Sequence, residues 1–293
     1  MVAGTSPFWS RERTFPGHAG TAREPGGCRL RLPYDEQPRT GLRRCSTELR
    51  CGSLDRVHIG RRADVEDRDA ADAGERALIV DLDPQANATS GLGERANGSS
   101  TYELLDGAPL EQLAKATAFP RLHLVPSRPE LAGAAVELAG RSDGETYLRK
   151  ALDAGRDDYG FVFLDCPPSL GPLTVNALSA ADRVLVPVQA EYYALEGLSQ
   201  VVRSVELVRY RLNPRLALAG VLLTMVDGRT KLSAEVAAEV RRHFGELVFR
   251  TMVPSSVRLA EAPSYGMPAI RYDRHSAGAE AYWKVAMELV ERS

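Results

Sequence analysis

Two short apolar segments of this sequence each end in aspartate. Residues 77–80 run into Asp81 and Asp83, and residues 161–164 run into Asp165. Apolar runs of this length without alternation are typical of strands that are buried on both faces of a parallel sheet. Carboxylates that follow such strands lie at the edge where open α/β sheets bind ligands. These residues therefore indicate a ligand site, and the alternative for the first segment is an ordinary strand followed by an Asx-type turn.

The residues around these aspartates resemble one protein family. The stretch from Asp81 reads Asp-Leu-Asp-Pro-Gln-Ala-Asn-Ala-Thr-Ser-Gly-Leu-Gly, and the second segment ends in Asp-Cys-Pro-Pro. Both stretches resemble motifs of the ParA/Soj partition ATPases, which belong to the deviant Walker A branch of the P-loop NTPases. A single apolar strand with one aspartate would be weak support, whereas the two motifs in one chain are specific. The resemblance covers roughly residues 73–293.

The resemblance implies a role for each candidate site residue. Asp83 would orient the attacking water, Asp81 would lie beside the magnesium site, and Asp165 would hold Mg²⁺ through water. Thr224, which opens the family-like segment Thr-Met-Val-Asp-Gly-Arg-Thr, and Pro254 are expected at the nucleotide, with the backbone around Pro254 flanking the adenine. ATP and magnesium are the implied cofactors.

One element that the resemblance requires is missing. Relatives carry a strand, a Lys-Gly-Gly-x-Gly-Lys-Thr-Thr loop and a helix before the first aspartates, and this loop binds phosphates through backbone N–H groups and lysines. The present sequence has no Gly-Lys pair, and its first lysine is Lys115. We therefore expect impaired ATP binding and hydrolysis, and a gap in the sheet where the strand would stand. Residues 1–72 are either translated from the wrong frame or a genuine replacement.

The elements that must position these residues alternate along the chain. Apolar segments near residues 77–80, 161–164, 183–188 and 216–225 are predicted to be strands, with helices between them. This order predicts an α/β fold with a doubly wound, mostly parallel, P-loop NTPase-like sheet that lacks the usual first strand and phosphate loop. Two domains are expected: an irregular segment over residues 1–72, which sustain no strand or helix period, and an incomplete ParA-like nucleotide-binding domain over residues 73–293.

Composition excludes several classes of protein. The net charge of −2 gives no global basic field, and 44% hydrophobic residues suffice for one sizeable core. The four cysteines lack a metal-binding spacing, and neither a signal peptide nor a membrane span is visible, so we expect a cytoplasmic protein. The sequence lacks the basic amphipathic tail by which the related MinD proteins bind membranes, so no membrane partner is expected.

The resemblance implies a function in chromosome or plasmid partitioning. Such proteins dimerise with ATP, bind DNA non-specifically on the nucleoid, and hydrolyse ATP when a ParB-type partner stimulates them. Arg229 and Arg258 are candidate contacts to DNA phosphates, with ordinary exposed charges as the alternative. Because the phosphate loop is missing, two other possibilities stay open: a non-catalytic DNA- or partner-binding remnant, and an inactive frameshifted gene product.

Overall fold

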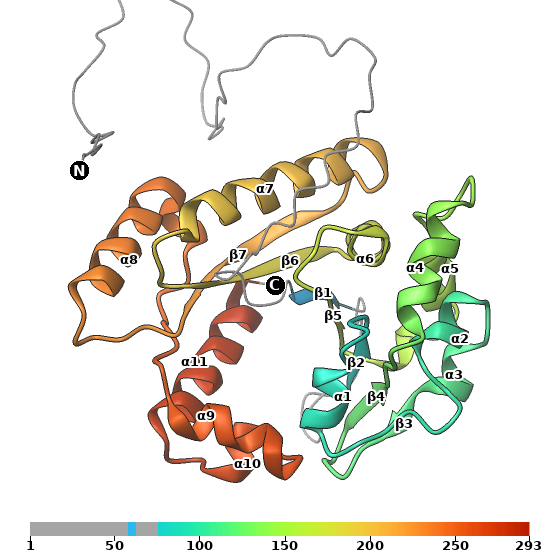
Figure 1. The fold of residues 1–293 in the computed structure, drawn as a ribbon, viewed down its shortest axis with the longest axis horizontal. Coiled ribbons are helices and arrows are strands. Elements are labelled where there is room, and N and C mark those ends of the chain that lie inside the picture. Colours follow the sequence, from blue (N-terminus) through green and yellow to red (C-terminus); the bar gives the residue numbers. More distant parts are fainter. Residues whose placement is uncertain (1–57, 63–75, 293) are drawn as a thin grey trace, which may run out of the picture. The chain divides into compact units, whose positions relative to one another are not determined.

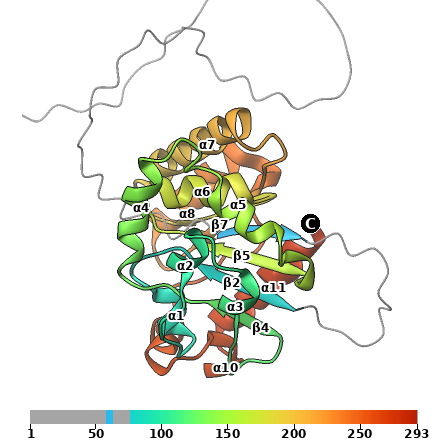
Figure 2. The same cartoon turned by 90° about the vertical axis from the view of Figure 1, so that its right-hand side faces the viewer.

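The computed structural model describes residues 58–62 and 76–292. The chain divides into two units, Met1–Glu48 and Leu49–Ser293, and all described residues belong to the second unit. Within this unit, helices lie on both faces of a sheet (Figures 1 and 2). The predicted doubly wound, mostly parallel α/β fold is confirmed.

The described strands form one sheet in the order β3-β4-β2-β5-β1-β6-β7. Their bounds are β1 His58–Arg62, β2 Ala77–Asp81, β3 Lys115–Ala116, β4 Leu122–Val125, β5 Phe161–Asp165, β6 Arg183–Gln189 and β7 Ala217–Thr224. Strands β4, β2 and β5 are mutually parallel, and β6 is parallel to β7. Strand β1 is antiparallel to both β5 and β6, so these two point the same way. The C-terminal ends of β2, β4, β5, β6 and β7 therefore share one edge of the sheet, called the carboxyl edge below.

The centre of the sheet corrects one expectation. We expected irregular structure over residues 1–72 and a gap in the sheet, but β1 occupies the position between β5 and β6. The segment His-Ile-Gly-Arg-Arg shows no strand pattern in the sequence, and it is a strand through backbone pairing with two neighbours. The rest of residues 1–72 lies outside the described residues.

The helices connect the strands in chain order. Their bounds are α1 Asn87–Gly91, α2 Thr101–Leu105, α3 Leu110–Leu113, α4 Leu131–Ala139, α5 Tyr147–Asp153, α6 Pro172–Ala180, α7 Ala194–Arg211, α8 Lys231–Phe244, α9 Val257–Glu261, α10 Ala269–Tyr272 and α11 Ala277–Arg292, with short 3-10 turns η1 Arg156–Asp158, η2 Gly245–Leu247 and η3 Ala262–Tyr265. Local sequence determines where two of these helices start. Pro172 opens α6, where the missing N–H costs nothing, and the Thr230 hydroxyl caps α8 by accepting a bond from the Ser233 N–H.

The two faces of the sheet carry separate apolar clusters. The larger cluster joins one face to α2 and α4–α8, and it includes Leu78, Val162 and Val184 of the strands. Helix α7 contributes apolar residues at intervals of three and four, with Leu198, Val201, Val205 and Val208 buried. The smaller cluster joins the other face to α11, and it contains Leu185, Leu222, Phe249, Val253, Ala281 and Val285.

We predict that Gly220→Ala destabilises the fold by about 1–3 kcal/mol because the new methyl group has no space. A Cβ at Gly220 would lie 2.5 Å from the Leu247 carbonyl oxygen and 2.7 Å from the Phe249 ring, at a φ of +156°. The measurement is the free energy of unfolding in urea. Gly228→Ala is the matched control, since a Cβ at Gly228 meets nothing within 4 Å. Equal stability of the two variants would contradict the packing described here.

Candidate functional site

Asp81 and Asp165 end adjacent parallel strands at the carboxyl edge. The register pairs Asp81 directly with Asp165, and the Leu82 N–H donates to the Asp165 carbonyl oxygen at 2.8 Å. The two residues are 0% and 4% exposed. The pairing therefore places two carboxylates side by side in a buried position at the carboxyl edge.

The Asp81 carboxylate is held by three donors. Its Oδ2 accepts bonds from the Thr89 N–H at 2.9 Å and from the Thr89 hydroxyl at 2.7 Å, and its Oδ1 accepts the Asp83 N–H at 3.1 Å. Burial raises the pKa of Asp81 from 3.8 to about 6, and nearby Asp165 adds to this rise, although the hydrogen bonds of Thr89 and Asp83 oppose it. The hydrogen bonds thus fix the orientation of the Asp81 carboxylate, and its burial disfavours the ionised form.

Asp83 begins the turn that leads from β2 into α1. Its Oδ1 accepts the Gln85 N–H at 2.9 Å, and its carbonyl oxygen accepts the Ala86 N–H at 2.9 Å. Ala86 adopts a left-handed backbone conformation, with φ +53°, immediately before α1. Asp83 is 3% exposed, and its N–H donates to the Asp81 carboxylate at 3.1 Å, so the turn places it next to Asp81.

Three further polar residues belong to this site and were missed in the sequence. The Thr89 hydroxyl accepts the N–H of Ser127, which follows β4, at 2.9 Å. The Thr101 hydroxyl donates to the Asp81 carbonyl oxygen at 2.7 Å. These bonds tie β2, α1, α2 and the end of β4 together. Thr89 lies within the motif that begins at Asp81, which was the available signal for it. For Thr101 and Ser127 the only signal was that small hydroxyl residues follow predicted strand ends, and this is too common to identify partners so distant in sequence.

The two residues predicted at the nucleotide lie at the far strand of the same edge. Thr224 ends β7, is 3% exposed, and its carbonyl oxygen accepts the Ala190 N–H at 3.1 Å. Pro254 is bridged to Val226, two residues beyond Thr224, and lines a cavity of about 530 Å³ together with Met252 and Lys284. The structure therefore places Pro254 on a largely apolar cavity, whereas Thr224 is not among its lining residues.

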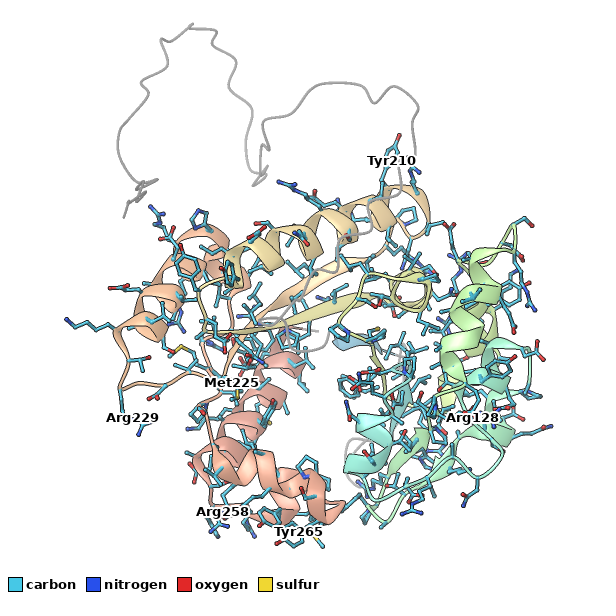
Figure 3. All side chains as sticks on the ribbon, in the orientation of Figure 1. Arg128, Tyr210, Met225, Arg229, Arg258 and Tyr265 are labelled. Atoms are coloured by element: carbon cyan, nitrogen blue, oxygen red, sulfur yellow. The ribbon has the colours of Figure 1, made fainter. Side chains whose placement is uncertain are left out.

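The two arginines proposed for DNA lie apart from each other on exposed segments (Figure 3). Arg229 is 90% exposed and forms a bidentate pair with Asp227, at 2.9 Å from Nε and 2.8 Å from Nη2. The hydrogen bonds from Arg229 lower the pKa of Asp227 to about 2. Arg258 lies 3.1 Å from Glu261 and 3.5 Å from Asp273. Each arginine would have to exchange a carboxylate for a phosphate in order to bind DNA.

The acidic residues at the carboxyl edge fit a magnesium ion that keeps much of its hydration. Carboxylate oxygens are the donors that Mg²⁺ prefers, and the ion is usually held by one or two carboxylates, water and substrate phosphates. Over residues 58–62 and 76–292, no three His, Cys, Asp or Glu side chains converge closely enough to hold a metal by themselves.

Among the described residues, the lysines that could bind the phosphates of a nucleotide do not lie on β2 or β5, the strands that carry Asp81 and Asp165. Lys115 lies on the edge strand β3, Lys150 pairs with Asp143 at 2.7 Å, and Lys231 begins α8. Lys284 lines the cavity at Pro254, and the sequence between β1 and β2 contains no lysine. Moreover, β1 runs against β5, so the chain leaves β1 at the edge opposite the carboxylates.

Comparison with known proteins identifies close relatives. The family described as "AAA domain" matches residues 69–218. The chain is 54% identical over 220 residues to the chromosome-partitioning ATPase Soj of Thermus thermophilus, covering 75% of this chain and 85% of that protein. It is 49% identical over 219 residues to the sporulation initiation inhibitor protein Soj of Bacillus subtilis, covering 74% and 87%.

Two solved structures are also similar. Cobyrinic acid a,c-diamide synthase from Mycobacterium smegmatis, with a bound ATP analogue and magnesium, has a TM-score of 0.65 at 36% identity, covering 74% of this chain and 82% of that one. The complex of an McdA variant from Cyanothece with ATP has a TM-score of 0.67 at 22% identity, covering 74% and 86%, and it supports the fold alone. As for membranes, none of the helices in the described part of the chain has the length and apolarity needed to span a bilayer.

We predict that Asp81 makes the fold more stable as the pH falls from 7 towards 4. Its pKa is raised in the folded protein, so the folded state binds the proton more tightly than the unfolded state, and the stabilisation is lost again as the pH rises through about 6. The contribution over this range should approach ~3 kcal/mol. The measurement is the free energy of unfolding against pH for the wild type and for Asp81→Asn.

The asparagine of Asp81→Asn also changes the hydrogen bonds to Thr89, which alters stability at every pH. The prediction therefore concerns how the difference in unfolding free energy between the wild type and Asp81→Asn changes with pH. Asp227→Asn is the control: the pKa of Asp227 is lowered, so this variant should leave the slope between pH 5 and pH 7 unchanged. Parallel curves for the wild type and Asp81→Asn would show that the carboxylate is solvated.

Proposed function

Since the chain belongs to the ParA/Soj family of chromosome-partitioning ATPases, we propose that it is a partition protein that keeps the carboxylate half of the nucleotide site without the phosphate-binding half. The observation that carries this proposal is the register of Asp81 with Asp165, buried at the carboxyl edge. In this proposal Asp165 and Asp81 hold Mg²⁺ through water, Asp83 orients the attacking water, and Pro254 flanks the adenine, with Thr224 supporting the strand beside it.

The absence of the phosphate-binding half should impair ATP hydrolysis. Phosphoryl transfer depends almost entirely on positioning and on the neutralisation of charge at the phosphates, which bound Mg²⁺ and loop lysines normally supply. Losing a single donor of developing negative charge typically costs about 10²–10³ in rate. Here no lysine precedes Lys115, and Asp81, Asp83 and Asp165 add negative charge where a triphosphate would lie.

We predict that the chain binds ATP at least about a hundredfold more weakly than a chimera in which the segment before residue 73 is replaced by the corresponding part of Thermus thermophilus Soj, because each hydrogen bond to a charged phosphate contributes about 1.5–3 kcal/mol. Titration calorimetry with ATP and magnesium measures both proteins. Asp165→Ala in the chimera is the control and should remove the magnesium dependence. Tight, magnesium-dependent ATP binding by the chain as given would refute the proposed impairment.

The second candidate function is DNA binding without nucleotide, in keeping with a family that acts on non-specific DNA as a homodimer with a ParB-type partner. The observation that favours it is that Arg229 and Arg258 are both well exposed, at 90% and 55% of their side chains, and their carboxylate partners are also at the surface. Arginine can bind a phosphate through two parallel hydrogen bonds, as Arg229 already binds Asp227.

If Arg229 and Arg258 contact DNA phosphates, replacing either by alanine should reduce the slope of log affinity against log salt by about one. Asp227→Asn should act in the opposite direction and strengthen binding, since it releases Arg229. Gel retardation of unrelated duplexes without nucleotide measures these effects. Arg203→Ala, on the exposed side of α7, is the control. Binding that is insensitive to salt, or equally weakened by Arg203→Ala, would contradict the assignment.

A further inference from the structure

A cavity beside helices α10 and α11 contains none of the carboxylates of the candidate site. The two helices contact each other, and the cavity has a volume of about 720 Å³. This volume is within the usual range for sites that bind small molecules. The lining includes one large aromatic side chain, three permanent cations and one carboxylate, which are Trp283, Arg271, Arg274, Lys284 and Glu280.

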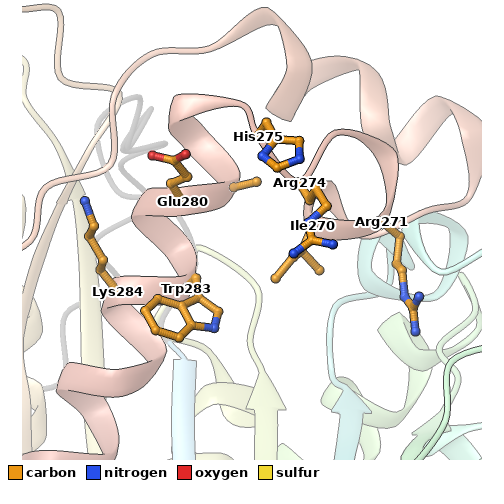
Figure 4. A pocket seen from close by; sticks show the side chains of 8 residues that line it. Ile270, Arg271, Arg274, His275, Glu280, Trp283 and Lys284 are labelled. Atoms are coloured by element: carbon orange, nitrogen blue, oxygen red, sulfur yellow. The ribbon is translucent and has the colours of Figure 1, made fainter.

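The apolar part of this cavity is open to solvent. Trp283 of α11 is 56% exposed, and Ile270 of α10 is 47% exposed. Figure 4 shows Ile270 and Arg274 between Trp283 on one side and Arg271 on the other. An indole ring offers a large planar face, so a planar ring of a ligand could stack on Trp283 while arginines lie close by.

Arg271 and Arg274 have no acidic partner. In the described part of the chain, neither guanidinium group forms an ion pair or a hydrogen bond. The neighbouring carboxylates are bound elsewhere, since Arg258 lies 3.1 Å from Glu261 and 3.5 Å from Asp273. The positive charge of Arg271 and Arg274 is therefore not neutralised by this region of the protein.

The other two charged residues do not reverse the sign of the lining. Glu280 and Lys284 line this cavity and also the cavity at Pro254. In Figure 4 Lys284 lies on the side of α11 that is remote from Arg271. One carboxylate among three permanent cations leaves the lining positive, and a positive concave surface attracts anions.

We propose that this cavity binds one nucleotide unit, with its base stacked on Trp283 and its phosphates on Arg271 and Arg274. Arginine binds phosphate through two parallel N–H donors, and an aromatic side chain stacks on any nucleobase. Stacking requires a base without a complementary strand, so the ligand is a free nucleotide or a unit of single-stranded nucleic acid. The contacts proposed above for Arg229 and Arg258 differ, because they involve the backbone phosphates of duplex DNA.

The test uses the full-length chain carrying Trp9→Phe, so that Trp283 is the sole tryptophan. The probes are thymidine monophosphate and a 5′-phosphorylated thymidine hexamer, and we expect saturable quenching of the Trp283 emission. Arg271→Ala and Arg274→Ala should each weaken binding about tenfold or more, because each removes hydrogen bonds to a charged phosphate. Arg209→Ala, an exposed arginine of α7, is the matched control and should leave the affinity unchanged.

Two replacements of Trp283 separate stacking from charge. Measured by the anisotropy of a fluorescein-labelled hexamer, Trp283→Ala should weaken binding at least about fivefold, and Trp283→Tyr should retain most of it because tyrosine also stacks. A hexamer that binds more tightly than the monophosphate assigns the cavity to a single strand, whereas equal affinities assign it to a free nucleotide. ATP and magnesium are left out of every titration, so these results do not depend on the proposed partition function.

Several results would overturn the proposal. One is thymidine that binds as tightly as thymidine monophosphate, and another is tripolyphosphate that binds as tightly as the hexamer. An affinity that Trp283→Ala or Arg271→Ala leaves unchanged would also contradict it. Residues 63–75 include six acidic residues. Binding that appears only after these six are changed to asparagine and glutamine would assign the cavity to this chain's own acidic segment instead.

Discussion

The in-register pairing of β2 with β5 is the constraint on which the candidate site depends. It brings Asp81 and Asp165 to the same level of a buried edge, where two carboxylates repel each other and lose hydration. Hydrogen bonds from Thr89 and Asp83 offset part of this cost for Asp81, but they do not remove it, because the pKa of Asp81 is still raised. Such an arrangement is stabilised further by a cation, which is the property that a magnesium–phosphate site requires.

Strand β1 completes the backbone pairing of the sheet, but its direction does not serve phosphate binding. A backbone of either direction can satisfy the hydrogen-bonding groups of β5 and β6, so an antiparallel segment closes the sheet. Phosphate binding is stricter, because the loop must start at the carboxyl edge and present N–H groups and lysines there. The antiparallel β1 meets the first requirement, and its direction takes the chain away from the carboxyl edge.

The parts of the site that could be predicted were those defined by local sequence. The aspartates Asp81, Asp83 and Asp165 follow apolar runs and sit in two specific motifs, so their positions at strand ends were predictable. Thr101 and Ser127 were not, because their partners lie 20 and 38 residues away and hydroxyl residues are common after strands. The proximity of Pro254 to Val226 likewise depends on a bridge between two segments that share no local pattern.

The sequence by itself determined the family, the alternation of strands and helices, and the absence of a phosphate loop. Each of these depends on motifs or apolar runs of contiguous residues. Only the tertiary structure decided that, in the part of the chain it describes, β1 lies between β5 and β6, that β1 is antiparallel, and that Asp81 pairs in register with Asp165. These features depend on which backbone segments pair and which faces meet. They arise from contacts between residues far apart in the chain, and no local period or motif encodes such contacts.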